Sequence, residues 1–127
     1  MIEAGEIDVA IDELRWLLDG CSGMIEAHCV LGELALSGDD DVRLARGHYG
    51  AAYQLGLQAL KRAGMPAPVP YEFEPNQSFF RAGKGLAYCL DRLHQRAMAI
   101  EVLEQLAELD PANPLGIQDL LQGMRQT

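Results

Sequence analysis

The sequence predicts an all-α protein built from antiparallel helix pairs, and two observations support this. Apolar residues recur at three- and four-residue steps over most of the 127-residue chain. Clusters of Gly, Pro and Asp interrupt that periodicity at the spacing expected of helix ends. No segment has the sustained two-residue alternation of a strand, so we expect helices and loops only.

Three helices are predicted before the middle of the chain, at 5–19, 22–36 and 42–63. Gly20 ends the first, whose apolar stripe lies opposite acidic residues. The acidic run Asp39–Asp41 supplies N-cap candidates for the third helix, because carboxylates suit the positive end of a helix dipole. The run lacks the alternating ligands of a calcium loop, so capping is the expected role.

The second half of the chain begins with a proline-rich segment, 64–76. Four of its prolines fall within ten residues, which predicts a loop with no helix. Helices are predicted at 77–92 and 95–109, and a capping helix is predicted at 113–125. Asn113 would cap this last helix and Pro114 would occupy its first turn.

Composition bounds the class of protein. The length suits one domain, and a net charge of −9 disfavours a general binder of nucleic acid or of anionic membranes. Three widely spaced cysteines fit a reducing compartment better than a disulfide framework, so we expect a cytoplasmic location. The longest apolar stretches are a few residues long, which predicts neither a transmembrane helix nor a signal peptide.

One pattern of small and large apolar residues occurs three times. A small residue is followed by further apolar residues four and seven positions later. These positions are Ala10, Leu14 and Leu17, then Ala45, Tyr49 and Ala52, then Ala99, Leu103 and Leu106. In the preceding helices the pair Leu31-Gly32 corresponds to Leu86-Ala87, and such a large-small pair lets two helices approach closely.

This pattern resembles the tetratricopeptide repeat (TPR), a helix-turn-helix unit of about 34 residues with a proline after its second helix, where Pro111 stands here. The resemblance covers residues 5–111 and implies helix pairs stacked as a short right-handed TPR-like superhelix. Its parts are a half repeat at 5–19, a repeat at 22–63 with a long second helix, an insertion at 64–76, a repeat at 77–111 and the capping helix.

The resemblance also implies a non-catalytic adaptor that binds a protein or peptide segment in a concave groove. The first helix of each pair would line this groove, with Glu26, Cys29, Glu33 and Leu36 from one and Arg81, Lys84, Tyr88, Asp91 and Arg92 from the other. The groove would therefore be acidic in one repeat and basic in the next, which keeps acidic peptides open as partners. A solvated helix face is the alternative reading of the same charges.

Part of the apolar face of the first predicted helix lacks a partner within the chain. Val9, Leu14 and Trp16 could form a homodimer contact, or the loop 66–75 could fold back over them. The same loop alternates aromatic and acidic residues from Tyr71 to Glu74. It could fill the groove, widen it, or be a packed connector over the core.

Other classes of function fit the sequence less well. A redox or metal-handling protein would use Cys21, His28 and Cys29, yet His28 and Cys29 are adjacent on a helix and point about 100° apart. We expect His28 in the core and no metal site or cofactor.

Gly83-Lys84-Gly85 lacks the spacing of a phosphate loop. No nucleophile has a placed base, so catalysis is not expected, and a purely structural homo-oligomer is the remaining alternative.

Overall fold

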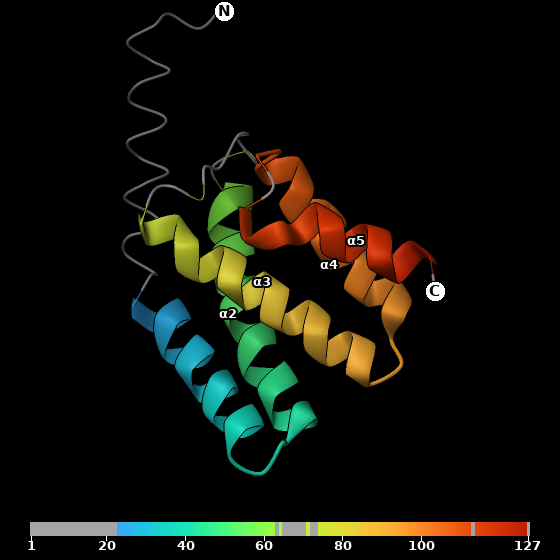
Figure 1. Ribbon diagram of the computed structural model, residues 1–127. Helices are drawn as coiled ribbons and strands as arrows, with labels where there is room; N and C mark the ends of the chain where they lie inside the picture. Colours follow the sequence, from blue (N-terminus) through green and yellow to red (C-terminus); the bar gives the residue numbers. More distant parts are fainter. Residues whose placement is uncertain (1–22, 63, 65–70, 72–73, 113, 127) are drawn as a thin grey trace, which may run out of the picture.

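The structure is a computed structural model that describes residues 23–62, 64, 71, 74–112 and 114–126. Within those ranges the chain forms helices and turns and no strand, which confirms the all-α prediction. A helix runs over 23–37 and is followed by α2 (Val42–Arg62), α3 (Glu74–Arg92), α4 (Arg96–Leu109), the short 3-10 turn η1 (Pro114–Gly116) and α5 (Ile117–Gln126), as Figure 1 shows. The first predicted helix, 5–19, lies outside the described residues.

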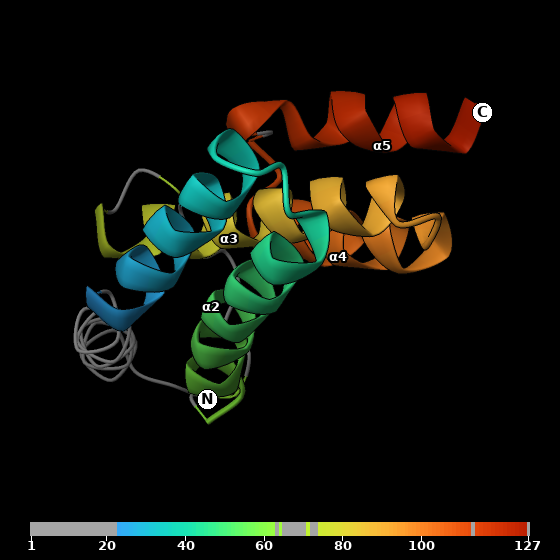
Figure 2. The ribbon, with the colours of Figure 1, turned by 90° about the horizontal axis from the view of Figure 1, so that it is seen from below.

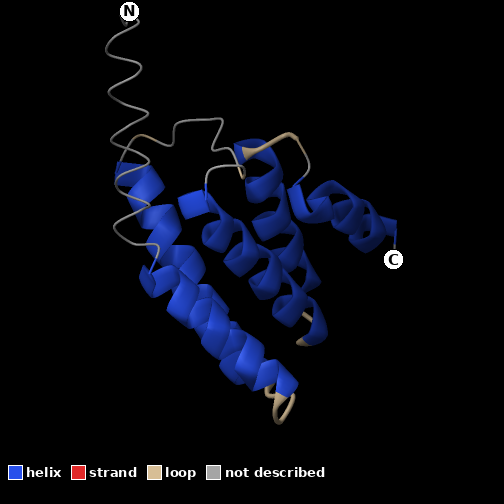
Figure 3. Ribbon diagram, turned by 60° about the vertical axis from the view of Figure 1, so that its left-hand side comes forward, coloured by secondary structure: helices blue, strands red, loops and turns tan. Residues whose placement is uncertain are grey.

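The helices form two antiparallel hairpins and a terminal helix. Helix 23–37 pairs with α2, as the contact between His28 and His48 shows, and α3 pairs with α4. α3 packs against both α2 and α4, and α5 packs against α4, so α3 is the central helix (Figures 1 and 2). Short loops close both hairpins (Figure 3). Of the described residues, no helix is long and apolar enough to cross a membrane.

Both hairpin turns contain a non-glycine residue with positive φ, Asp40 at 50° and His94 at 62°. In the first turn, the Asp41 carboxylate accepts a hydrogen bond from the Leu44 backbone N–H at 3.1 Å. This contact satisfies one of the free N–H groups at the start of α2 and confirms the predicted capping role for Asp41.

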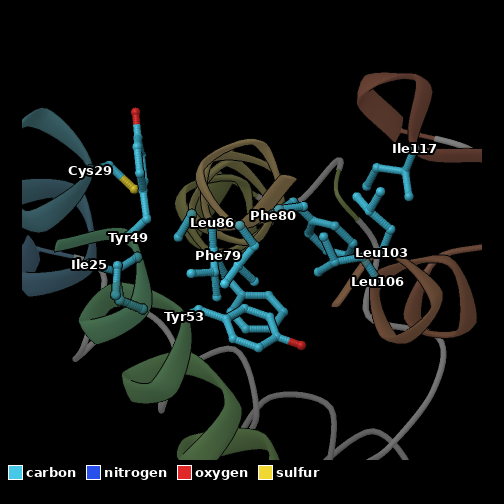
Figure 4. Close-up of a cluster of buried hydrophobic side chains, with 14 of the residues drawn as sticks. Ile25, Cys29, Tyr49, Tyr53, Phe79, Phe80, Leu86, Leu103, Leu106 and Ile117 are labelled. Carbon is cyan, nitrogen blue, oxygen red and sulfur yellow. The ribbon is translucent and has the colours of Figure 1, made fainter. Parts of the chain in front are cut away.

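Among the described residues the core runs through all five helices, from Ile25 to Leu121, and Figure 4 shows part of it. Its centre is aromatic: the Phe79 ring stacks on Tyr53 at 5.3 Å and meets Phe80 edge-on at 5.6 Å. The aligned positions of the two described copies are all buried, namely Ala45, Tyr49, Ala52, Ala99, Leu103 and Leu106. The register read from the sequence therefore matches the pattern of burial.

Glycines set the closest helix contacts. The Tyr49 ring lies between Gly32 of helix 23–37 and Gly85 of α3, where an added Cβ would come within 2.8 Å and 2.6 Å of ring atoms. A Cβ at either glycine would collide with the ring, so the absence of a side chain lets the helices close on Tyr49. This confirms the close approach predicted from Leu31-Gly32.

Two predicted helix boundaries are wrong. α3 begins at Glu74, so its first turn contains Pro75, which the sequence reading assigned to a loop. Proline is tolerated there because the N–H groups of a first turn have no helical partner. α5 begins at Ile117, after the predicted start at 113, because Leu115 and Gly116 have positive φ of 58° and 66°. Asn113, the predicted cap, lies outside the described residues.

The proline-rich segment is anchored to the core at Tyr71. Its backbone N–H donates to the buried Asp110 carboxylate at 2.8 Å, and its ring meets Phe80 edge-on at 5.9 Å. The other Asp110 oxygen accepts from the Ala112 N–H at 3.0 Å. Tyr71 therefore acts as a packed connector; residues 65–70 and 72–73 lie outside the described part of the chain.

Candidate functional site

The predicted acidic and basic halves of the groove meet at Arg81. Its guanidinium contacts Glu26 at 3.0 Å and Glu33 at 2.8 Å. The two glutamates lie two turns apart on one side of helix 23–37, so a single guanidinium on α3 spans both. The hydrogen bond that Arg81 donates to Glu33, with the charge of Glu26, raises the pKa of Arg81. The two charged surfaces predicted as separate patches are thus joined by ion pairs.

Arg92 makes a second connection between the hairpins. Its two terminal nitrogens donate to the two carboxylate oxygens of Asp40 at 2.6 Å and 2.8 Å. The same guanidinium donates to the Tyr88 hydroxyl at 3.3 Å. These hydrogen bonds raise the pKa of Arg92 and lower that of Asp40. Bidentate pairing holds the turn of the first hairpin against the end of α3.

Lys84 connects α3 to the C-terminal helix. Its Nζ donates to the Leu115 backbone carbonyl at 3.1 Å, in the turn before α5. Asp91, also expected in the groove, accepts from Arg96 Nε at 2.8 Å. The three basic side chains predicted to bind a partner are therefore engaged within the chain.

We call the surface formed by Glu26, Glu33, Arg81, Lys84, Tyr88 and Arg92 the groove face. The side chains of its ion pairs are between 37% and 59% exposed. Exposed pairs of this kind contribute little to stability, because water screens the two charges. Tyr88 is half-exposed beside Arg92 and adds aromatic surface. A ligand that supplies equivalent charges can exchange with these pairs at small cost.

Cys29 does not line the groove, and this part of the prediction is wrong. Its side chain is fully buried, and its Sγ lies 3.5 Å from the Ser78 backbone carbonyl on α3. Leu36 also packs partly against the core. Cys29 faces α3 because α3 crosses helix 23–37 on the side of the helix where Cys29 lies. Burial raises the pKa of Cys29 to about 11, and that of Cys89 to about 11.

These pKa values predict that neither buried thiol reacts in the folded protein. A thiol of pKa about 11 is roughly one part in a thousand thiolate at pH 8, and the thiolate is the reactive form. In a Cys21→Ser chain, we expect almost no release of nitrothiobenzoate from Ellman's reagent at pH 8, and two equivalents after addition of guanidinium chloride. A fast-reacting thiol in the folded chain would contradict the buried placement.

His28 is half-buried beside His48 and is not part of the core, so its predicted placement is wrong, and its contact with His48 was not predicted. The two Nδ1 atoms are 3.3 Å apart and the ring centroids 5.5 Å apart. The missed signal was the turn at 38–41, because residues at similar distances from a hairpin turn face one another. Cys29 points elsewhere and Cys21 lies outside the described residues. In the described ranges, no three His, Cys, Asp or Glu side chains converge as metal ligands would.

The predicted dimer contacts Val9, Leu14 and Trp16 also fall outside the described residues. Comparison of the chain with protein-family models, with curated proteins and with solved structures finds no match in any of the three.

Proposed function

We propose that the protein is a non-catalytic interaction module of TPR-like architecture that binds a peptide segment of a partner protein along the groove face. The observation that carries this proposal is the gathering of both signs of charge with a half-exposed tyrosine over two neighbouring helices. Arg81 and Arg92 suit acidic side chains of a peptide, and Glu26 and Glu33 suit basic ones. A peptide of mixed charge is the expected ligand.

The exchangeable character of the ion pairs supports this function. Each pair is partly solvated, so a peptide replaces weak internal contacts with contacts that also bury Tyr88. The alternative of thiol chemistry is disfavoured because burial holds the pKa of Cys29 and of Cys89 near 11.

A charge swap separates binding from folding. Reversing Arg81 alone would gather three acids, so the test uses Glu26→Arg, Glu33→Arg and Arg81→Glu together, which preserves pairing between the helices. Peptides are first selected on the native protein from a displayed random library, and their Kd values are then measured by fluorescence anisotropy. We expect the swap to weaken binding at least about tenfold, or roughly 1.4 kcal/mol, with an unchanged melting temperature.

The matched control is Arg43→Glu, which reverses an exposed charge on α2 away from the groove face and should leave Kd unchanged. Tyr88→Ala should weaken binding without altering the fold. Selected peptides that bind the swapped protein and the Tyr88→Ala protein as tightly as the native one would refute the proposal.

A further inference from the structure

The first hairpin has a second surface, which α3 does not cover. Large apolar side chains are exposed there: Met24 at 59%, Leu31 at 44%, Leu34 at 60% and Leu44 at 51%. We call the surface of Met24, Ala27, Leu31, Leu34, Leu44 and His48 the open face. At about 100° per residue, Met24 and Leu31 point away from Glu26 and Glu33. Ala27 and Leu34 lie between these two directions on helix 23–37. Apolar surface of this kind marks an interaction site.

The second hairpin shows what such a surface normally contacts. Leu86 is the aligned counterpart of Leu31, and it is buried because α2 covers it, with a Cβ at Gly50 falling 3.8 Å from its side chain. Leu31 has the same place in its own hairpin and remains exposed. The open face is therefore shaped to receive another helix pair.

The two ends of the open face are complementary in shape. Near the turn, a hollow of about 300 Å³ is lined by Leu31, Leu34, Leu44 and His48, with Asp39 and Asp41 at its rim. At the other end, Met24 projects into solvent. A methionine side chain is unbranched and adapts to irregular cavities. One end offers a hollow and the other a side chain that can enter it.

The two ends are also complementary in charge. Asp39 and Asp41 are exposed at the turn, and Lys61 and Arg62 are exposed at the far end of α2. Arg62 follows Leu44 by 18 residues, which is five helical turns, so both lie on one side of α2. The ends of this 21-residue helix are about 30 Å apart. The face is thus acidic at one end and basic at the other.

We propose that the open face is a self-association surface, on which a second copy of the chain packs about a two-fold axis with the hairpins antiparallel. A two-fold contact pairs each end of the face with the opposite end of the other copy. The acidic hollow of each copy then receives Met24 and Arg62 of the other, and the axis passes near the His28 and His48 pair. This inference goes beyond the peptide-binding proposal and concerns a surface of helix 23–37 that contains none of the groove-face residues.

The first test measures the mass of the full chain by light scattering over a range of concentrations. The native protein is expected to be a dimer of the 13.9 kDa chain. Leu34→Glu with Leu44→Glu should give a monomer of unchanged helicity, with dimer affinity lowered at least about a hundredfold, because both side chains are already exposed within the chain. The matched control is Met98→Glu, which alters an exposed apolar residue of α4 and should leave the dimer intact.

A charge cycle tests the antiparallel orientation. Asp39→Arg and Arg62→Asp should each weaken the dimer several-fold, and the two changes together should restore it, because the proposed contact joins these residues across the axis. If the double variant forms a dimer no tighter than that of either single variant, the proposed orientation is overturned. Peptide affinity at the groove face should be the same in all these variants, so the two proposals fail separately.

A native chain that is monomeric at every concentration overturns the proposal. In that case a cysteine is introduced by Leu34→Cys in a Cys21→Ser chain, and its reaction with maleimide is measured. Protection of this cysteine in the monomer assigns the open face to residues 5–19 of the same chain. A dimer that survives Leu34→Glu with Leu44→Glu also overturns the proposal and assigns association to another surface, such as that of Val9, Leu14 and Trp16.

Discussion

Replacement of Phe79 by alanine is expected to lower the free energy of unfolding by about 3–5 kcal/mol. The ring is fully buried, stacks on Tyr53 and meets Phe80 edge-on. Its removal leaves a cavity between α2 and α3 that these rigid neighbours cannot fill. Urea unfolding followed by circular dichroism at 222 nm measures the change as a lower midpoint with a similar slope.

Tyr88→Ala is the control for this prediction, since it removes an aromatic side chain of α3 that is half-exposed. A change within about 0.5 kcal/mol is expected there. The two substitutions lie in the same helix and differ in burial. Equal losses of stability in the two variants would contradict the placement of the core at Phe79.

Gly56→Ala and Gly47→Ala are expected to change stability in opposite directions, although both glycines lie within α2. A Cβ at Gly56 would collide with the Phe79 ring, whereas none lies within 4 Å of other atoms at Gly47. Overpacking costs about 1–3 kcal/mol and the gain in helix propensity is about 1 kcal/mol. We expect Gly56→Ala to destabilise by about 1–2 kcal/mol and Gly47→Ala to stabilise by up to about 1 kcal/mol.

The collision can be isolated by a double-mutant cycle in urea. In a Phe79→Leu chain the ring is gone, so Gly56→Ala should lose most of its cost. Gly47→Ala should have the same effect in both chains because it contacts nothing near residue 79. A cost of Gly56→Ala that persists without the ring would refute the steric explanation.

Local sequence signals predicted most of the helix boundaries. The helices at 23–37, α2 and α4 begin and end within about one residue of the described part of their predicted ranges. Glycine or aspartate marks the turn at 38–41 and the end of α4 at Asp110, next to runs of helical periodicity, and both signals act over a few residues. The start of α3 was missed because Pro75 was read as a helix breaker, although a first turn accepts proline.

The candidate site was predicted only in part. The charged residues of the groove face were predicted from the resemblance to the tetratricopeptide repeat, which implies which side of each helix lines a groove. The ion-pair partners of these residues could not be predicted, since Arg81 contacts glutamates that lie 48 and 55 positions away in the sequence. Cys29 was assigned to the groove because the sequence does not reveal on which side α3 crosses helix 23–37.

The sequence by itself determined the helical class, the hairpin turns and the aligned buried positions of α2 and α4, because these depend on backbone preferences and periodicity within a few turns. Only the tertiary structure decided which charges neutralise one another, that Cys29 is in the core and that Leu31 is exposed while its counterpart Leu86 is buried. Such features depend on which distant helix packs against each surface. Two residues with the same local pattern can therefore differ in exposure and in role.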